Sequence, residues 1–398
     1  MDEYLRIIGR KHPLFVADII SLMERLDRVV SNSAFLVIGG AGSIGSAVVK
    51  EIFKRNPLRL HVIDISENNL TELVRDIRSE FGYIDGDFRT FAIDVGSKEY
   101  DSYFEINNSF DYVLNLSALK HVRSEKDVFT LMRMIDVNIF NTIKTIKQCK
   151  EKNIKNYFCV STDKAANPVN LMGASKRIME MFAFNESLNS QIKISMARFA
   201  NVAFSDGSLL HSFKERIAKK QPIAAPKDVK RYFLTPQESG ELCLLSCIFG
   251  ENGDIFFPKL DKDIHLLDFL SILRNFLAQK GIKVYECLSE DEARSKVKSL
   301  NLDNYWPCYL SISDTTGEKD YEEFFTDNED LVMNIFESIG VIKTKINFDQ
   351  KKVNNFYKNI INLKQSKNPS KKKIIDEFFK LLPKLDYEDK EKYLDAKM

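Results

Sequence analysis

The chain has 398 residues, a formal net charge of +1, and hydrophobic and charged fractions of 44% and 29%. This length can bury one large core or two domains, and the composition is that of a globular protein. The balanced charge excludes an overall field that favours nucleic acid or an acidic membrane. No apolar run reaches the ~18 residues of a membrane span. The start, Met1-Asp2-Glu3-Tyr4, lacks the basic region followed by an apolar core that marks a secretory signal, so we expect a cytoplasmic protein.

Six cysteines are scattered along the chain: Cys149, Cys159, Cys243, Cys247, Cys287 and Cys308. Cys243 and Cys247 are four residues apart in an apolar, helical pattern, which leaves a zinc pair as the alternative. No second Cys/His pair follows them. We therefore expect buried, reduced thiols and no metal site.

An N-terminal helical segment is expected over residues 1–33. Pro13 suits a first helical position, which predicts a helix over 13–30. Its apolar residues recur at helical spacing: Val16, Ile19, Ile20, Met23, Leu26 and Val30. We expect this stripe to pack on the following domain or on another subunit.

From residue 34 the pattern alternates between strands and helices. Strands are predicted at 34–39, 58–63, 91–93, 112–116, 157–160 and 192–197, and helices at 43–54, 68–80, 127–150 and 172–187. This rhythm predicts an α/β fold of the Rossmann type, a doubly wound parallel sheet over residues 34–203. Right-handed crossovers bring the carboxyl ends of its strands to one edge, where the motifs fall.

Beyond residue 203 the alternation breaks, which indicates a smaller substrate lobe over residues 204–330. Residues 214–226 are predicted as loops and short elements, whereas pieces within 238–258 return to the main sheet. Residues 331–398 are expected to be a Lys-rich extension, helical or partly disordered. Asp and Glu alternate with its lysines, so we interpret it as a solvated face, not a nucleic-acid site.

The run Gly39-Gly40-Ala41-Gly42-Ser43-Ile44-Gly45 follows a predicted strand and opens a predicted helix. Glycine at 39, 42 and 45 permits a tight turn and close approach to a pyrophosphate, and the helix N-terminus at Ser43 and Ile44 supplies N–H groups. Asp64 comes 19 residues after Gly45 and can accept the ribose hydroxyls. No Arg or Lys directly follows it, which favours NAD over NADP. The alternative is a glycine-rich turn without a ligand.

Two later strand ends complete the expected cofactor site. Asp94 and Val95 follow the third strand and are candidates for the adenine. Ser117 and Ala118 follow the fourth and are candidates for the nicotinamide ribose. A strand-end turn is the alternative for each.

The fifth strand delivers Ser161-Thr162-Asp163-Lys164 to the same edge. Met172 and Lys176 follow one helical turn apart and therefore share a helix face. In the short-chain dehydrogenase pattern these two positions hold Tyr and Lys, where Tyr is the acid and base and Lys binds the nicotinamide ribose. For Asp163 and Lys164 the alternative is an ordinary loop ion pair.

Taken together, these motifs resemble the UDP-N-acetylglucosamine 4,6-dehydratases of the extended short-chain dehydrogenase family, often called polysaccharide biosynthesis CapD-like proteins. The resemblance covers about residues 5–325. It also rests on further segments that occur in the family's order along the chain, outside the nucleotide and catalytic motifs: 118–122, 165–168, 198–202, 231–233 and 316–319. Some members carry N-terminal membrane helices, and this chain looks like the soluble kind.

The resemblance implies a reaction on UDP-N-acetylglucosamine. It comprises NAD-dependent oxidation at C4, elimination of water across C5 and C6, and return of hydride to C6. The acid and base positions fall on Asp163 and Lys164, with Thr162 beside them to bond the sugar. Substrate contacts are implied for a further set: Lys120, His121, Asn201 and Arg231. Gly317-Glu318-Lys319 is expected to close the substrate lobe.

Met172 departs from the pattern because a thioether cannot take a proton from the C4 hydroxyl. Relatives with Met here resemble the branch that retains the C5 configuration, so we expect retention. Lys176, Asp163 or a water remain candidates to assist C4 oxidation. The alternatives are a sugar-nucleotide 4-epimerase, which normally needs the Tyr, and a non-catalytic NAD and UDP-sugar binder, which would not need the Asp163–Lys164 pair. We also expect a homo-oligomer, a dimer or larger.

Overall fold

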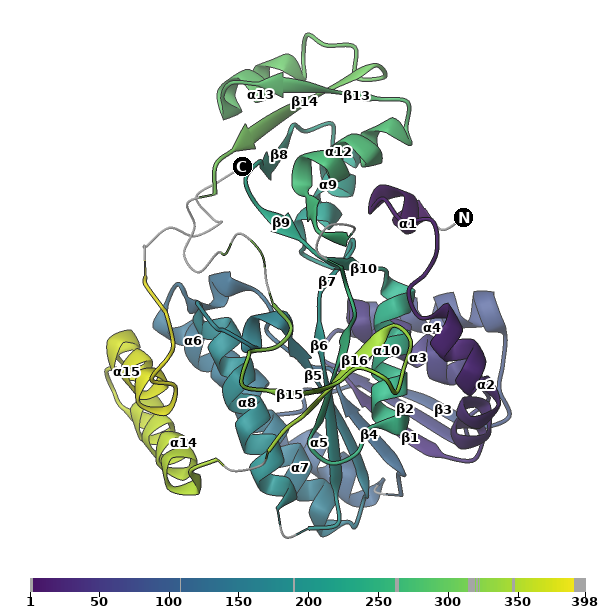
Figure 1. The fold of residues 1–398 in the computed structure, drawn as a ribbon, viewed down its shortest axis with the longest axis vertical. Helices are drawn as coiled ribbons and strands as arrows, with labels where there is room; N and C mark the ends of the chain where they lie inside the picture. The colour runs from purple at the N-terminus through teal and green to yellow at the C-terminus, as the bar shows by residue number, and fades with distance from the viewer. Residues whose placement is uncertain are drawn as a thin grey trace.

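The computed structural model describes residues 3–107, 109–188, 190–261, 265–313, 319, 321, 323–345 and 348–389. A large sheet with helices on both faces forms the lower body in Figure 1, and a smaller lobe lies above it. The strand order of the sheet is β15-β16-β11-β6-β5-β4-β1-β2-β3. The strands are β1 Ala34–Ile38, β2 Arg59–Asp64, β3 Asp87–Ala92, β4 Tyr112–Asn115, β5 Asn156–Thr162, β6 Lys193–Phe199, β11 Asp254–Pro258, β15 Asp330–Val332 and β16 Ile339–Lys343.

The sheet has the predicted Rossmann-type, doubly wound architecture. Strands from β3 to β11 run parallel, and the order 3-2-1-4-5-6 reverses between β1 and β4. β1 is buried along its whole length, as its apolar sequence AFLVI predicts for a strand covered on both faces. The crossover and flanking helices are α3 Ser43–Phe53, α4 Glu67–Phe81, α5 Lys98–Ile106, α6 Val128–Ile135, α7 Asn141–Glu151, α8 Leu171–Ser187 and α10 Pro236–Phe249.

The smaller lobe has its own three-stranded parallel sheet, in the order β13-β14-β8. Its elements are α9 Leu209–Ala218, β8 Ile223–Pro226, α12 Phe269–Ala278, β13 Lys283–Cys287, α13 Glu290–Lys296 and β14 Tyr305–Ser311. Phe213, Phe276 and Trp306 belong to a hydrophobic cluster separate from that of the large sheet. Two short pairings join the parts: β7 Asn201–Val202 with β10 Phe233–Leu234, and β9 Lys230–Arg231 with β12 Leu267–Asp268.

Two helices precede β1, where the sequence predicted one. α1 Glu3–Ile7 packs against the small lobe, and α2 runs over Val16–Ser31 instead of beginning at Pro13. Leu26 and Val30 of the predicted stripe are buried, but Ile20 remains 63% exposed. α2 packs near α10 of the large domain, and the apolar stripe predicted from the sequence is wider than the face of α2 that this packing buries.

The predictions differ from the structure at three further places. α9 runs over 209–218 and so includes residues 214–218, the first part of the stretch 214–226 that was predicted as loops and short elements. The predicted helix 127–150 is interrupted by the π-helical turn η2 Asp136–Phe140. Residues 339–343 form β16 instead of part of a helical extension. An apolar run here pairs with β11, and Gly340 admits the Phe257 ring, which would lie 2.2 Å from an added Cβ.

The extension proper is a hairpin of α14 Gln350–Gln365 and α15 Lys371–Leu381, drawn in yellow-green beside α8 in Figure 1. Across the described ranges, no helix combines the length and apolar character needed to cross a bilayer. Each of the six cysteines is buried and free of disulfide bonds.

Candidate active site

The loop between β1 and α3 has the shape of an anion-binding cradle. Gly39 has φ +73°, and an added Cβ would lie 2.6 Å from the backbone nitrogen of Ser117. A Cβ on Gly45 would lie 2.1 Å from the Gly39 carbonyl oxygen. The N-cap residue Gly42 has no side chain to satisfy the N–H groups of the first helical turn. These amides, which begin with Ser43 and Ile44, therefore suit a phosphate.

Asp64 lies at the end of β2 and braces this loop. Its two carboxylate oxygens accept hydrogen bonds from Ala41 N at 3.0 Å and from Ser66 N at 2.9 Å. Each oxygen keeps a further lone pair for a ribose hydroxyl.

Asp94 holds a different arrangement after β3. It accepts hydrogen bonds from Gly96 N and from Arg133 Nη2, both at 2.8 Å. Desolvation opposes ionisation of Asp94, but these donors outweigh it and lower the carboxyl pKa. Val95 beside it is buried, and its carbonyl accepts a hydrogen bond from Lys144 Nζ at 3.1 Å. Asp94 thus already bonds to Gly96 and Arg133, and Val95 packs in the hydrophobic core.

The loop after β4 is fixed by an asparagine that the sequence did not single out. Asn138, in the π-helical turn η2, accepts from Leu119 N at 2.9 Å and donates to the Leu119 carbonyl at 3.1 Å. It also donates to Ser175 Oγ of α8 at 2.9 Å. Ser117 Oγ donates to Asn115 Oδ1 at 2.7 Å, and Ala118 lies between these anchors. The sequence offered one sign of this role, because Asn138 is a polar residue among apolar neighbours in the predicted helix.

The predicted acid and base form a close pair at the end of β5. Lys164 Nζ lies 3.0 Å from Asp163 Oδ1. The same oxygen accepts from Lys164 N at 2.9 Å and from Thr162 Oγ1 at 2.8 Å. Asp163 is buried, whereas Thr162 and Lys164 are half-buried. Thr162 and Lys164 are therefore the more accessible residues of this arrangement, and Asp163 is the buried one.

The first turn of α8 lies directly against this pair. Asn170 caps the helix by accepting a hydrogen bond from Gly173 N at 2.7 Å. An added Cβ on Gly173 would lie 2.5 Å from the Lys164 carbonyl oxygen, so glycine permits the contact. Met172 is buried, and Lys176 Nζ donates to the Val160 carbonyl at 3.0 Å. Burial lowers the pKa of Lys176 to about 8.

A buried ionic network supports the strand that carries the pair. Ser161 Oγ donates to Glu180 Oε1 at 2.6 Å. Arg198 contacts both Glu180 oxygens, at 2.9 and 2.8 Å, and both Glu329 oxygens, at 2.9 and 2.8 Å. Burial opposes ionisation of Glu180, but Arg198 outweighs it and lowers the carboxyl pKa to about 2. This network, which the sequence did not predict, fixes β5, β6 and α8 together.

The expected substrate residues lie in two groups. Lys120 is exposed and His121 half-buried, and burial together with nearby cations lowers the His121 pKa. His121 lies against Gly207, whose added Cβ would be 2.9 Å from Nε2. The neighbouring residue Asp206 donates its N–H to Ser43 Oγ at 2.8 Å, so this group borders the glycine loop.

The second group lies between the sheet and the lobe. Asn201 is half-buried in β7, and its N–H donates to the Tyr232 carbonyl at 3.1 Å. Arg231 is buried, and its Nη1 donates to the carbonyls of Lys230 at 2.8 Å and Lys319 at 2.9 Å. Arg231 thus holds the Lys319 backbone. Gly317 and Glu318, expected to close the lobe, lie outside the described residues.

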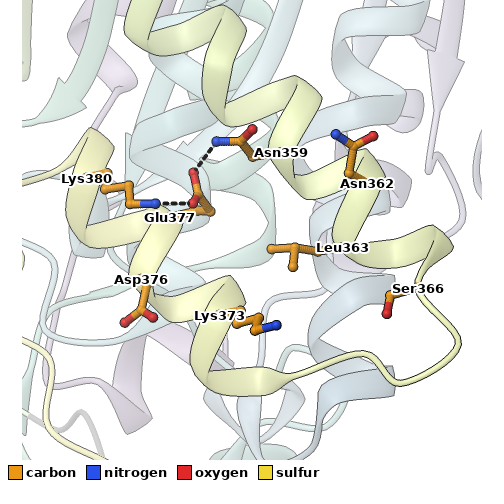
Figure 2. Close-up of a pocket in the computed structure, with 8 residues that line it drawn as sticks. All are labelled: Asn359, Asn362, Leu363, Ser366, Lys373, Asp376, Glu377 and Lys380. Carbon is orange, nitrogen blue, oxygen red and sulfur yellow. Dashed lines mark hydrogen bonds and ion pairs between the residues drawn. The ribbon is translucent and has the colours of Figure 1, made fainter.

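Figure 2 shows a groove between α14 and α15. It is lined by Asn359, Asn362, Leu363, Ser366, Lys373, Asp376, Glu377 and Lys380. Glu377 of α15 joins the two helices by accepting a hydrogen bond from Asn359 of α14 at 2.8 Å, and it also accepts one from Lys380 of its own helix at 2.5 Å. The groove shares no residue with the site at the sheet edge.

Residues 35–344 match the family of polysaccharide biosynthesis proteins. The chain belongs to this family. An uncharacterised membrane protein of Methanocaldococcus jannaschii is 30% identical over 81% of this chain and 89% of its own length. A UDP-N-acetylglucosamine 4,6-dehydratase (inverting) of Campylobacter jejuni is 29% identical over 72% of this chain and 85% of its own length.

Two further comparisons bear on length and fold. The capsular polysaccharide biosynthesis protein CapD of Staphylococcus aureus is 28% identical over 84% of this chain, which spans only 53% of CapD. The X-ray structure of Pen from Bacillus thuringiensis superimposes with a TM-score of 0.63 at 22% identity, covering 83% of this chain and 98% of Pen. That likeness shows a shared fold over most of both chains.

Proposed function

We propose that this protein catalyses the NAD-dependent 4,6-dehydration of UDP-N-acetylglucosamine to the 4-keto-6-deoxy sugar, with retention at C5, for surface-glycan biosynthesis. The observation that carries the proposal is the Asp163–Lys164 pair, 3.0 Å apart, at the sheet edge that also holds the glycine cradle. The Campylobacter jejuni dehydratase among the relatives supports the same reaction class.

The residues present fit NAD. The Gly39–Gly45 cradle and the uncapped start of α3 suit its pyrophosphate, and Asp64 has lone pairs for the adenosine ribose. Lys176, with Ser117 and Ala118, would border the nicotinamide end. When bound, NAD supplies a reversible hydride acceptor for the sugar.

The acid and base would act as one unit. In the neutral form of the pair, the Lys164 amine takes the C5 proton while the Asp163 carboxylic acid protonates the departing C6 hydroxyl, so that water leaves. The pair then stands as ammonium and carboxylate. When hydride returns to C6, the Lys164 ammonium gives a proton back to C5, after exchange with solvent in heavy water. The proton released by the C4 hydroxyl during oxidation balances the one that Asp163 gives to the departing water, and the 3.0 Å separation of Lys164 Nζ and Asp163 Oδ1 allows protons to pass between the two groups. Thr162, which donates to the same oxygen, would orient the carboxyl group.

Met172 leaves the C4 hydroxyl without the tyrosine of related enzymes. Lys176 is our candidate substitute, because burial lowers its pKa to about 8 and a neutral amine can accept a proton. Residue 172 is also the basis for proposing retention at C5.

The deciding experiment incubates the purified protein with NAD and UDP-N-acetylglucosamine in heavy water, followed by mass spectrometry and proton NMR. Loss of one water, a new C6 methyl signal and deuterium at C5 support the dehydratase, and the ring couplings distinguish retention from inversion. An unchanged mass with a new C4 epimer would indicate an epimerase instead. Bound NAD with unchanged substrate would overturn the proposal for this sugar.

A further inference from the structure

A buried glutamate outside the proposed chemistry lies beside the first turn of α8. Glu125 ends the 3-10 turn η1 Val122–Glu125 and is 0% exposed. Its Oε2 accepts a hydrogen bond from Leu171 N at 2.6 Å. Its Oε1 has no hydrogen-bond partner within the described part of the chain. Burial raises the pKa of Glu125 to about 8, so the carboxyl group retains its proton at neutral pH.

The position of Glu125 connects two parts of the proposed site. On its own element, η1 directly follows Lys120 and His121, the expected substrate residues. On the facing element, Leu171 begins α8 and immediately precedes Met172. The carboxyl group therefore joins the substrate loop to the first turn of the catalytic helix.

The C-terminal hairpin approaches the same glutamate from outside. Lys371, at the start of α15, donates to the carbonyl of Lys126, the next residue after Glu125, at 3.5 Å. It also forms an ion pair with Asp389. Lys371 favours the ionised form of Glu125 and Asp389 opposes it. The hairpin lies outside the residues 35–344 that match the family.

We propose that Glu125 is a positioning residue of the active site, a neutral carboxylic acid that holds the substrate loop against α8, with Lys371 of the hairpin beside it. Ionised, it would carry a buried negative charge, which costs far more than a buried neutral carboxyl group and favours separation of η1 from α8. Catalysis should then depend on the proton of a group that never touches the sugar. The expected effects on activity rest on the proposed function.

The test compares Glu125→Gln, a neutral isostere, with Glu125→Ala, and uses Ser124→Ala on the same turn as control. We expect Glu125→Gln to keep kcat within about threefold of wild type, and Glu125→Ala to lower kcat at least ~tenfold through misplacement of the site. Ser124→Ala should change kcat less than about twofold. NAD content and the unfolding midpoint of each variant show whether it is folded.

Infrared spectroscopy gives a readout that needs no turnover. From about pH 6 to about pH 10, wild type should lose more carboxylic acid carbonyl absorption than Glu125→Gln, with the difference lost near pH 8. The absorption that remains in Glu125→Gln belongs to Glu241, whose pKa burial raises to about 7. Lys371→Met should move the loss to higher pH, because removal of the cation disfavours the carboxylate, whereas Lys372→Met, an exposed neighbour, should not.

The inference is overturned if wild type and Glu125→Gln show no such difference, or if Glu125→Ala is folded and as active as wild type. It is also overturned if Glu125→Gln is as impaired as Glu125→Ala. The infrared result separates this inference from the proposed function. That difference in a protein that does not dehydrate UDP-N-acetylglucosamine contradicts the function alone.

Discussion

Three donors converge on one oxygen of Asp163, and this crowding defines the chemistry at the residue scale. The Lys164 ammonium, the Lys164 N–H and the Thr162 hydroxyl all reach Oδ1, within 3.0 Å. Charge-assisted bonds of this kind are shorter and stronger than bonds between neutral groups. They fix the Asp163 carboxyl group in one orientation against the Lys164 side chain, so the proposed acid and base are held as one unit.

Removal of either member of the pair should stop dehydration without preventing binding. We expect Asp163→Asn and Lys164→Met each to lower kcat by about 10²–10⁴, the usual contribution of a positioned acid or base. Calorimetry should show UDP-N-acetylglucosamine binding within about tenfold of wild type. Lys155→Met, an exposed lysine just before β5, is the matched control and should retain activity. Full activity in either pair variant would contradict the assignment.

The Glu180–Arg198 contact should give stability a defined acid dependence. Because the folded-state pKa of Glu180 is lowered from 4.5 to about 2, its contribution is complete above about pH 4.5 and is lost as pH falls toward 2. At neutral pH, Glu180→Gln should reduce the free energy of unfolding by about 3–5 kcal/mol, since it leaves Arg198 partly uncompensated. Urea unfolding at several pH values should show this deficit shrinking with acidity. A deficit independent of pH would mean that the charge of Glu180 is not what stabilises the fold.

At the scale of elements, α8 organises the catalytic half of the site because it contacts the acid–base pair, the turn that holds Glu125, and strands β5 and β6. Its first turn touches Lys164 and Glu125, its second holds Lys176, and Glu180 reaches the strands. Asn138 of the neighbouring π-helical turn fixes Ser175. Such turns recur at functional sites, since they redirect side chains within a helix. A displacement of α8 would therefore disturb acid, base and cofactor contacts together.

Gly173 offers a direct test of the contact between α8 and the acid–base pair. A Cβ there would lie 2.5 Å from the Lys164 carbonyl oxygen, so Gly173→Ala must push the backbone of the pair away from the helix. We expect a fall in kcat of at least ~tenfold from misplacement and a loss of about 1–3 kcal/mol in stability from overpacking. Rates from mass spectrometry and urea unfolding measure the two effects. Unchanged kcat in the folded variant would show that the spacing is not critical.

At the scale of the whole molecule, local patterns predicted what depends on nearby residues. The apolar run at 34–38 and the glycines that follow it were enough to predict a buried strand and the turn into α3. The bond between Arg198 and Glu329 joins residues 131 apart, and no periodicity reports such a pairing. β16 was missed for the same reason, since its place depends on pairing with β11. The sequence thus indicated where the site lies, whereas the distant contacts that hold it in place could be recognised only in the structure.

The C-terminal hairpin should be an integral part of the large domain. The Phe378 ring lies 5.4 Å from that of Phe356, which lies 6.3 Å from Phe182 of α8, so one core runs from sheet to hairpin. Phe378 is fully buried, whereas its neighbour Phe379 is 37% exposed.

We expect Phe378→Ala to cost about 3–5 kcal/mol and Phe379→Ala less than ~1 kcal/mol, because only the first leaves a cavity. Urea unfolding followed by circular dichroism measures both values. If the hairpin were an independent appendage, Phe378→Ala would instead produce a separate early transition and leave the main midpoint unchanged. A single transition shifted to lower urea means that the hairpin which borders Glu125 unfolds together with the catalytic helix, as coupling between them requires.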